Sequence, residues 1–137
     1  MKQLAIVLAL LSTAAYARDN GQWEGNTPEI RQWFQELKQP DYPTSSCCGV
    51  ADAYWADSYE VSEHGEYVAI ITDERDDAKL TRPHIPVGTK IVVPNAKIKW
   101  DKGNPTGHGI IFVANVGDPE GTTDGWMVFC YLPPMGA

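Results

Sequence analysis

The segment PTSSCCGVADAYWAD, residues 43–57, places two adjacent cysteines between a proline-rich turn and a run of aromatic residues. The third cysteine, Cys130, lies in WMVFCYLPP near the end of the chain. A bond between these two segments would tie the chain that follows the first expected helix to the last expected strand. The state of the three sulfurs therefore decides much of the fold.

The first residues predict the compartment in which these cysteines reside. Lys2 precedes an apolar run from Leu4 to Ala15, and the AYA sequence at residues 15–17 has small residues at the positions that signal peptidase reads. The run is too short to span a bilayer as an anchor. We therefore expect a signal peptide over residues 1–17 and a single periplasmic or secreted domain over residues 18–137, with no membrane anchor after cleavage.

The charge of the chain excludes some partners. The chain contains 11 basic and 18 acidic residues, and its formal net charge is −7. Nucleic-acid binding depends on basic contacts to phosphate, so we expect no nucleic-acid partner. The sequence also lacks a phosphate loop and a dinucleotide-binding fingerprint, and it predicts no cofactor.

The clearest local pattern predicts a helix within NTPEIRQWFQELKQP, residues 26–40. Thr27 is a good N-cap, Pro28 suits the first helical position, and Pro40 ends the helix. One face carries an apolar stripe at helical spacing, which predicts packing against a core: Ile30, Trp33, Phe34 and Leu37.

The rest of the chain has the pattern of short strands. Residues 58–72 predict a hairpin that turns at Glu63–Glu66, and four further strands are expected at residues 89–94, 96–100, 108–116 and 126–134. Residues 49–59 fit a short helix or an irregular loop, and residues 73–83 fit an exposed charged loop. The expected fold class is α+β, with an N-terminal helix packed on a small, mostly antiparallel sheet or partly open barrel.

Three cysteines in an oxidising compartment leave one sulfur over after pairing. The possible bonds are Cys47–Cys130, Cys48–Cys130 and a strained Cys47–Cys48 bond. We expect a bridge to Cys130 and leave its partner open. Such a bridge closes a loop of about eighty residues, which is worth on the order of 4 kcal/mol through chain entropy. The structural interpretation of the leftover thiol is that it is buried and inert.

Four motifs carry a resemblance: SCCGVAD at residues 46–52, IPVGTKIVVPNAKI at 85–98, NPTGHG at 104–109 and VFCYLPP at 128–134. Together they resemble a group of small secreted bacterial proteins with a double cysteine, a following aspartate and a Cys-Phe-x-Pro-Pro-like ending. Its members often carry further cysteines after the aspartate and after the histidine. Here Ala53 and either Gly109 or Ile110 stand at those places, so fewer bridges are expected. The resemblance implies an architecture and no activity.

A second resemblance concerns papain-like cell-wall peptidases and amidases of the NlpC/P60 and CHAP kinds. They place a cysteine at the start of a helix and a histidine at the start of a later strand, as Cys48 and His108 are placed in this sequence. A helix N-terminus lowers a thiol pKa, and an imidazole can accept its proton. However, Gly49 stands where a small polar residue is usual, and Asn115 is the only candidate to orient the histidine ring.

A third alternative is a soft-metal site for copper or zinc, formed by Cys47 or Cys48 with Cys130 and His108. The histidine spacing matches no metal template, so we predict no metal ligands.

The remaining candidates are aromatic side chains flanked by carboxylates, which we expect to be partly exposed and to contact a ligand: Asp52, Tyr54, Trp55, Trp100 and Asp101. Such residues suit a protein, peptide or glycan partner. The sequence thus favours a non-enzymatic binding or envelope-associated module, with the peptidase and the metal-binding protein as alternatives.

Overall fold

A computed structural model describes residues 26–116 and 125–135. The expected signal peptide over residues 1–17 and the polar segment at residues 117–124 lie outside the described residues. Within the described ranges, no helix is long and apolar enough to cross a membrane.

Helix α1 spans Pro28–Glu36 and confirms the predicted helix. The Thr27 side chain accepts a hydrogen bond from the Ile30 backbone N–H at 3.4 Å, and Pro28 begins the first turn. Leu37 leaves the helical conformation, three residues before Pro40. The apolar stripe packs as expected, because Phe34 and Leu37 are buried and Ile30 and Trp33 contact the same core cluster.

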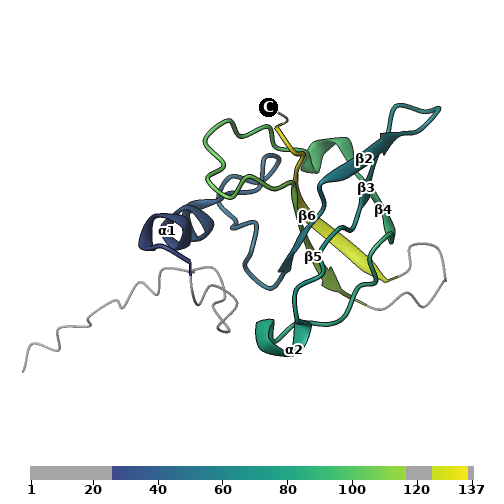
Figure 1. The fold of residues 1–137 in the computed structure, drawn as a ribbon. Helices are drawn as coiled ribbons and strands as arrows, with labels where there is room; N and C mark the ends of the chain where they lie inside the picture. Colours follow the sequence, from purple (N-terminus) through teal and green to yellow (C-terminus); the bar gives the residue numbers. More distant parts are fainter. Residues whose placement is uncertain (1–25, 117–124, 136–137) are drawn as a thin grey trace, which may run out of the picture.

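In the part of the chain that the structure describes, six strands form two three-stranded antiparallel sheets, which do not close into a barrel (Figure 1). The first sheet has the order β1-β5-β6, with β1 at Asp52–Trp55, β5 at Ile110–Asn115 and β6 at Trp126–Leu132. The second has the order β2-β3-β4, with β2 at Ser58–Val61, β3 at Tyr67–Ile70 and β4 at Lys90–Val93. The predicted α+β class and antiparallel pairing are confirmed, with two sheets in place of one.

The predicted hairpin is confirmed around Gly65, which adopts a positive φ of 78°. The Ser62 hydroxyl accepts the backbone N–H groups of His64 and Glu66 and so closes the turn. The register then places Tyr59 opposite Ala69 and Val61 opposite Tyr67.

Three local predictions are wrong. Residues 49–59, expected as a helix or loop, contain β1 and the start of β2, because β1 pairs with β5 far along the chain. Residues 96–100, expected as a strand, begin with the end of the 3₁₀ helix η1 at Asn95–Lys97, and only Ile98 forms a bridge, to Tyr131. Residues 73–83, expected as an exposed loop, include the short helix α2 at Asp77–Leu80 and two buried charged residues, Asp73 and Arg82.

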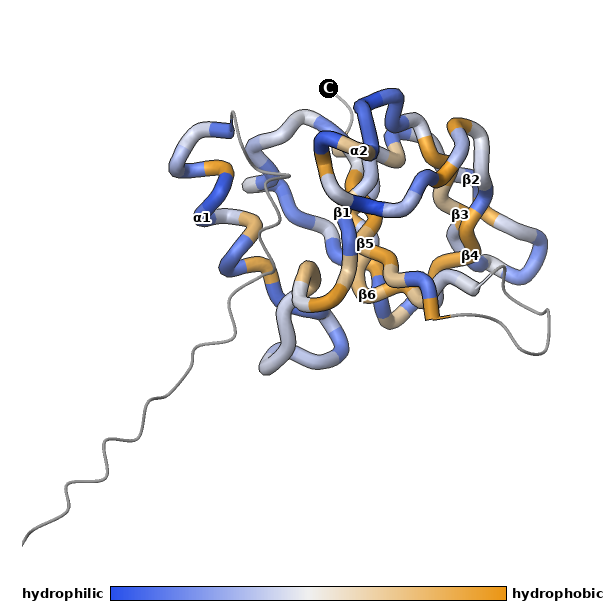
Figure 2. Tube along the Cα trace, turned by 90° about the horizontal axis from the view of Figure 1, so that it is seen from below, coloured by the Kyte–Doolittle hydropathy of each residue, from blue (hydrophilic) through white to orange (hydrophobic). Residues whose placement is uncertain are grey.

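Two apolar clusters make up the core. One joins α1 to one face of the first sheet and contains Phe34, Cys47, Phe112, Cys130 and Leu132. The other lies between the two sheets and contains Tyr54, Ile91, Val93, Ile111 and Tyr131. Strand β5 serves both clusters because its successive side chains point to opposite faces. Figure 2 shows the apolar residues gathered along β3, β4, β5 and β6.

Candidate functional site

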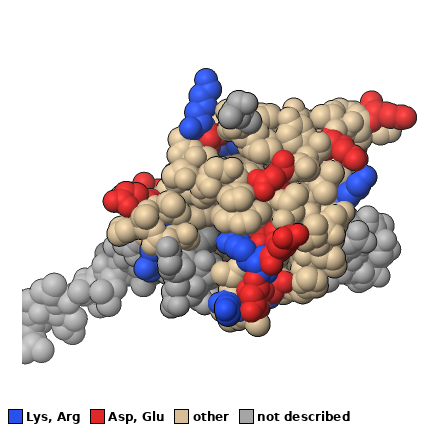
Figure 3. All heavy atoms as spheres, viewed as in Figure 1, with Lys and Arg blue, Asp and Glu red and all other residues tan. Residues whose placement is uncertain are grey.

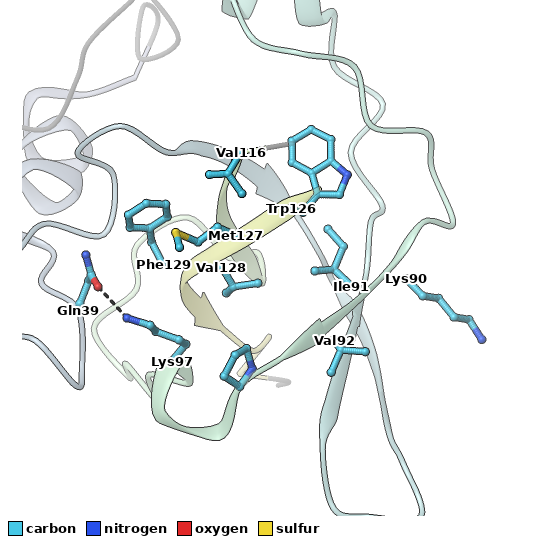
Figure 4. A pocket seen from close by; sticks show the side chains of 11 residues that line it. Gln39, Lys90, Ile91, Val92, Lys97, Val116, Trp126, Met127, Val128 and Phe129 are labelled. Atoms are coloured by element: carbon cyan, nitrogen blue, oxygen red, sulfur yellow. Dashed lines mark hydrogen bonds between the residues drawn. The ribbon is translucent and has the colours of Figure 1, made fainter. Parts of the chain in front are cut away.

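An open apolar groove of about 740 Å³ lies between β4 and β6 (Figure 4). Its walls come from both sheets, and its lining residues are Gln39, Lys90, Ile91, Val92, Pro94, Lys97, Val116, Trp126, Met127, Val128 and Phe129. Three of the apolar residues in this lining are more than half exposed: Val92 at 55%, Met127 at 51% and Val116 at 59%. Apolar side chains gathered in one hollow are characteristic of a binding surface.

Strand β4 alternates between exposed and buried side chains, and its outer edge borders the groove. Ile91 and Val93 are buried in the cluster between the sheets, whereas Lys90 and Val92 alternate with them and are exposed. Strand β4 is also the last strand of its sheet, so no further described strand covers it on that side.

Among the described residues, the two charged ones that line the groove are lysines, and both already have partners. The Lys97 ammonium donates to Gln39 Oε1 at 2.9 Å and to Asp41 Oδ1 at 2.9 Å. That hydrogen bond from Lys97 lowers the pKa of Asp41. The Lys90 ammonium pairs with Glu60 at 3.1 Å, and both side chains of this second pair are more than half exposed. Exposed pairs of this kind contribute little to stability and exchange partners readily.

The five residues predicted to bind a ligand differ in how far they are exposed. Tyr54 is 1% exposed, and its hydroxyl donates to Pro83 O, so the expectation that it is exposed is wrong. Trp100 is 53% exposed and contacts Tyr67, while Asp101 accepts the indole N–H of Trp33 at 3.1 Å and so holds α1 to the loop after η1. Asp52 is half-buried in β1. None of these five residues lines the groove.

Two side chains pack against the ring of Trp55. The His108 ring stacks on it with centroids 4.3 Å apart, and the Arg75 guanidinium lies 3.8 Å from its ring centroid. These contacts occupy the aromatic surface that a ligand would need. We therefore assign Trp55 a structural role.

His108 has an orienting partner that the sequence did not indicate. Its Nδ1 lies 3.0 Å from Asp57 Oδ2, and Asp57 also accepts the Gly109 backbone N–H and the Thr72 hydroxyl. The sequence offered Asn115 for this role, but strand pairing brings Asp57 to the histidine across 51 positions. No local pattern carries such a signal.

A second polar network, also missed from the sequence, closes the outer edge of β1. Asp73 accepts the Trp55 backbone N–H at 2.9 Å, and Arg82 donates to Ala53 O at 2.6 Å. Arg82 also pairs with Asp73 and Asp77, and Asp77 contacts His84. In Figure 3 acidic and basic side chains meet over α2, at the lower edge of the molecule.

The disulfide joins Cys47 to Cys130, with the Cα atoms 5.5 Å apart, which confirms the expected bridge to Cys130. Cys48 is the leftover thiol. It is fully buried, its Sγ donates to Phe34 O at 3.3 Å, and it lies 3.4 Å from the Ser46 hydroxyl. Burial raises the pKa of the Cys48 thiol, which disfavours the reactive thiolate.

The contacts of Cys48 and His108 lie in different parts of the fold. Cys48 contacts α1 and Ser46, whereas His108 contacts Asp57 and Trp55. The segment after Cys48 leads into strand β1, so no helix begins at the thiol. The geometry therefore gives the peptidase alternative no support.

The metal alternative would need sulfurs that the disulfide already uses. Cys47 and Cys130 are bonded to each other, and only the buried Cys48 thiol remains. Among the described residues, no group of three or more histidine, cysteine, aspartate or glutamate side chains is arranged to hold a metal ion.

Comparison of the chain with protein-family models, with curated proteins and with solved structures finds no match. The resemblance of its motifs to small secreted bacterial proteins stays a prediction. The function is therefore argued from the groove and its surroundings.

Proposed function

We propose that this protein is a small, non-enzymatic binding module of the periplasm or the cell exterior, and that its ligand lies in the groove between β4 and β6. The groove itself carries this proposal. Its volume of about 740 Å³ falls within the range of roughly 300–1,000 Å³ that is usual for ligand sites, and its lining is mainly apolar.

Two observations support the location. The Cys47–Cys130 disulfide is of a kind that persists in oxidising compartments. The first 17 residues have the pattern of a secretory signal peptide. An envelope-associated role fits both.

The arrangement of the polar groups favours binding over catalysis. The Cys48 thiol is buried, and the groove is lined by lysines and a glutamine as its polar groups. A few polar groups around an apolar surface orient a ligand, whereas acid–base or nucleophilic chemistry needs a reactive group within reach of it.

The test compares two substitutions on opposite edge strands of one sheet. Val92 on β4 lines the groove and Val61 on β2 does not, yet both are 55% exposed. We expect the mature protein to bind Nile red, a neutral apolar dye, and Val92→Asp to weaken that binding at least tenfold, because the new carboxylate must lose water when the dye binds. Val61→Asp should leave it unchanged. Equal binding by all three proteins would show that the groove is not the site.

A further inference from the structure

The open edge of β4 presents main-chain hydrogen-bonding groups to the groove. The Ile71 N–H donates to Thr89 O at 2.9 Å, and the Ser62 N–H donates to Glu66 O at 2.8 Å. Because bonded and non-bonded pairs alternate in an antiparallel ladder, these two bonds place Ala69 and Tyr67 in the positions that pair with β4. Their partners in the register are Ile91 and Val93.

The peptide groups of Lys90 and Val92 therefore turn away from β3, toward the groove. Both residues line it, and the opposite wall is formed by Trp126, Val128 and other residues of β6. An added strand beside β4 would lie over this apolar surface. Its alternate side chains would contact β6, and its backbone would pair with Lys90 and Val92.

In the other sheet, by contrast, the outer edge of β1 is blocked by side chains. At β1, Asp73 accepts a hydrogen bond from the Trp55 N–H, and Arg82 donates one to Ala53 O. These side chains therefore already bond the backbone groups with which a neighbouring strand would pair. Proteins commonly block exposed strand edges in such ways. Within the described residues, β4 has no comparable block on its outer side.

Charge complementarity indicates the chemistry of the occupant. The chain carries a net charge of −7, but among the described residues the charged ones that line the groove are Lys90 and Lys97. An ammonium has three N–H donors, and the two hydrogen bonds of Lys97 leave one available. The Lys90 ammonium points away from β6 toward Glu60, so of these two lysines Lys97 is the one that faces an occupant of the groove (Figure 4).

We propose that the occupant is an extended peptide segment of another protein, apolar at alternate positions and acidic at the end that lies beside Lys97, which adds to β4 as a fourth strand. This proposal rests on the groove being the ligand site. Main-chain pairing supplies affinity in this mode of recognition, and the alternating side chains supply specificity.

The experiment uses a fluorescent synthetic peptide of alternating valine and threonine with a glutamate at each end, and follows its anisotropy with the mature protein. Val92→Pro removes an N–H that faces the groove and places a ring against an incoming strand. Val61→Pro is the matched control, because Val61 is equally exposed and its N–H also faces the outer edge of the sheet. We expect Val92→Pro to weaken peptide binding at least tenfold and Val61→Pro to leave it unchanged.

A second measurement keeps the protein unchanged. Two versions of the peptide are N-methylated at alternate positions, one on the odd residues and one on the even residues. In strand addition only one set of amides faces β4, so one version should lose binding at least tenfold more than the other. Equal affinity of the two versions would overturn the proposal.

The failure of this inference is distinguishable from the failure of the proposed function. Nile red binding that depends on Val92, together with no peptide binding, would retain the groove as a ligand site and overturn strand addition. Self-association through β4 that excludes the peptide would also overturn it, because a second copy would then be the occupant.

Discussion

At Gly109 the chain passes so close to its neighbours that no side chain fits. A Cβ atom there would clash with the Ala56 carbonyl oxygen and lie 2.8 Å from Cδ of Pro134. The Gly109 backbone also accepts the Ala56 N–H and donates to Asp57. This glycine thus lets the start of β5, the end of β1 and the C-terminal segment meet.

We predict that Gly109→Ala lowers the free energy of unfolding by about 1–3 kcal/mol, because backbone and proline atoms must move apart. Gly49→Ala is the control. A Cβ atom at Gly49 meets only Ser46 O at 4.0 Å, so this change should lie within about 0.5 kcal/mol of the wild type or be slightly stabilising. Urea unfolding of the three proteins measures both values, and equal losses would contradict the close approach at Gly109.

Strand β1 is held by side chains that lie outside its own sheet. Asp73 and Arg82 bond its outer edge, and the Arg82 side chain is only 2% exposed. Burial by itself raises the pKa of Asp73, but the hydrogen bonds from Arg75 and Arg82 outweigh burial and hold the pKa well below its usual range. The ionised carboxylate is therefore part of the folded structure.

This depressed pKa predicts acid sensitivity. Its contribution to stability is fully present above the pKa of an unfolded aspartate, about 3.9, and is lost as the pH falls toward the lower pKa of the folded state. Asp73→Asn should lower the free energy of unfolding by about 3 kcal/mol at pH 7, since it leaves Arg82 poorly paired, and should flatten the loss of stability below about pH 4.

Urea unfolding measured between about pH 2 and pH 7 checks this prediction. Glu63→Gln, in the exposed turn between β2 and β3, is the control and should follow the wild type. If the curves for Asp73→Asn and the wild type ran parallel across this range, Asp73 would not be the group that titrates.

On the scale of the whole molecule, the Cys47–Cys130 bridge ties the segment after α1 to β6 across 83 positions. Replacing both cysteines by alanine should lower the free energy of unfolding by about 2–5 kcal/mol, because the unfolded chain regains the freedom that the bridge removes. Urea unfolding of the double variant measures the loss.

Intact mass after alkylation checks the state of all three sulfurs in the mature protein. The native protein should take up no alkyl group, because the Cys48 thiol is buried and its pKa is raised. Unfolding without reduction should expose one thiol, and reduction should expose three. Rapid alkylation of Cys48 in the native protein would contradict its burial and return the peptidase to consideration.

The features that could be predicted from the sequence are local. The Thr27 cap and the spacing of Ile30, Trp33 and Phe34 predicted α1, because helix formation depends on neighbours along the chain. The alternation around Glu63–Glu66 predicted the hairpin for the same reason. The cysteine count predicted a bridge to Cys130 and left its partner open.

Tertiary packing determines which segments far apart in the chain meet. It pairs Cys47, and not Cys48, with Cys130. It also forms β1 from residues that show no clear strand pattern, and it brings Asp57 to His108. It also produces the groove, whose lining comes from β4, β6 and four residues outside these strands: Gln39, Pro94, Lys97 and Val116. Strand pairing and burial act between residues that are distant in the chain, so the spacing of neighbouring residues does not record them.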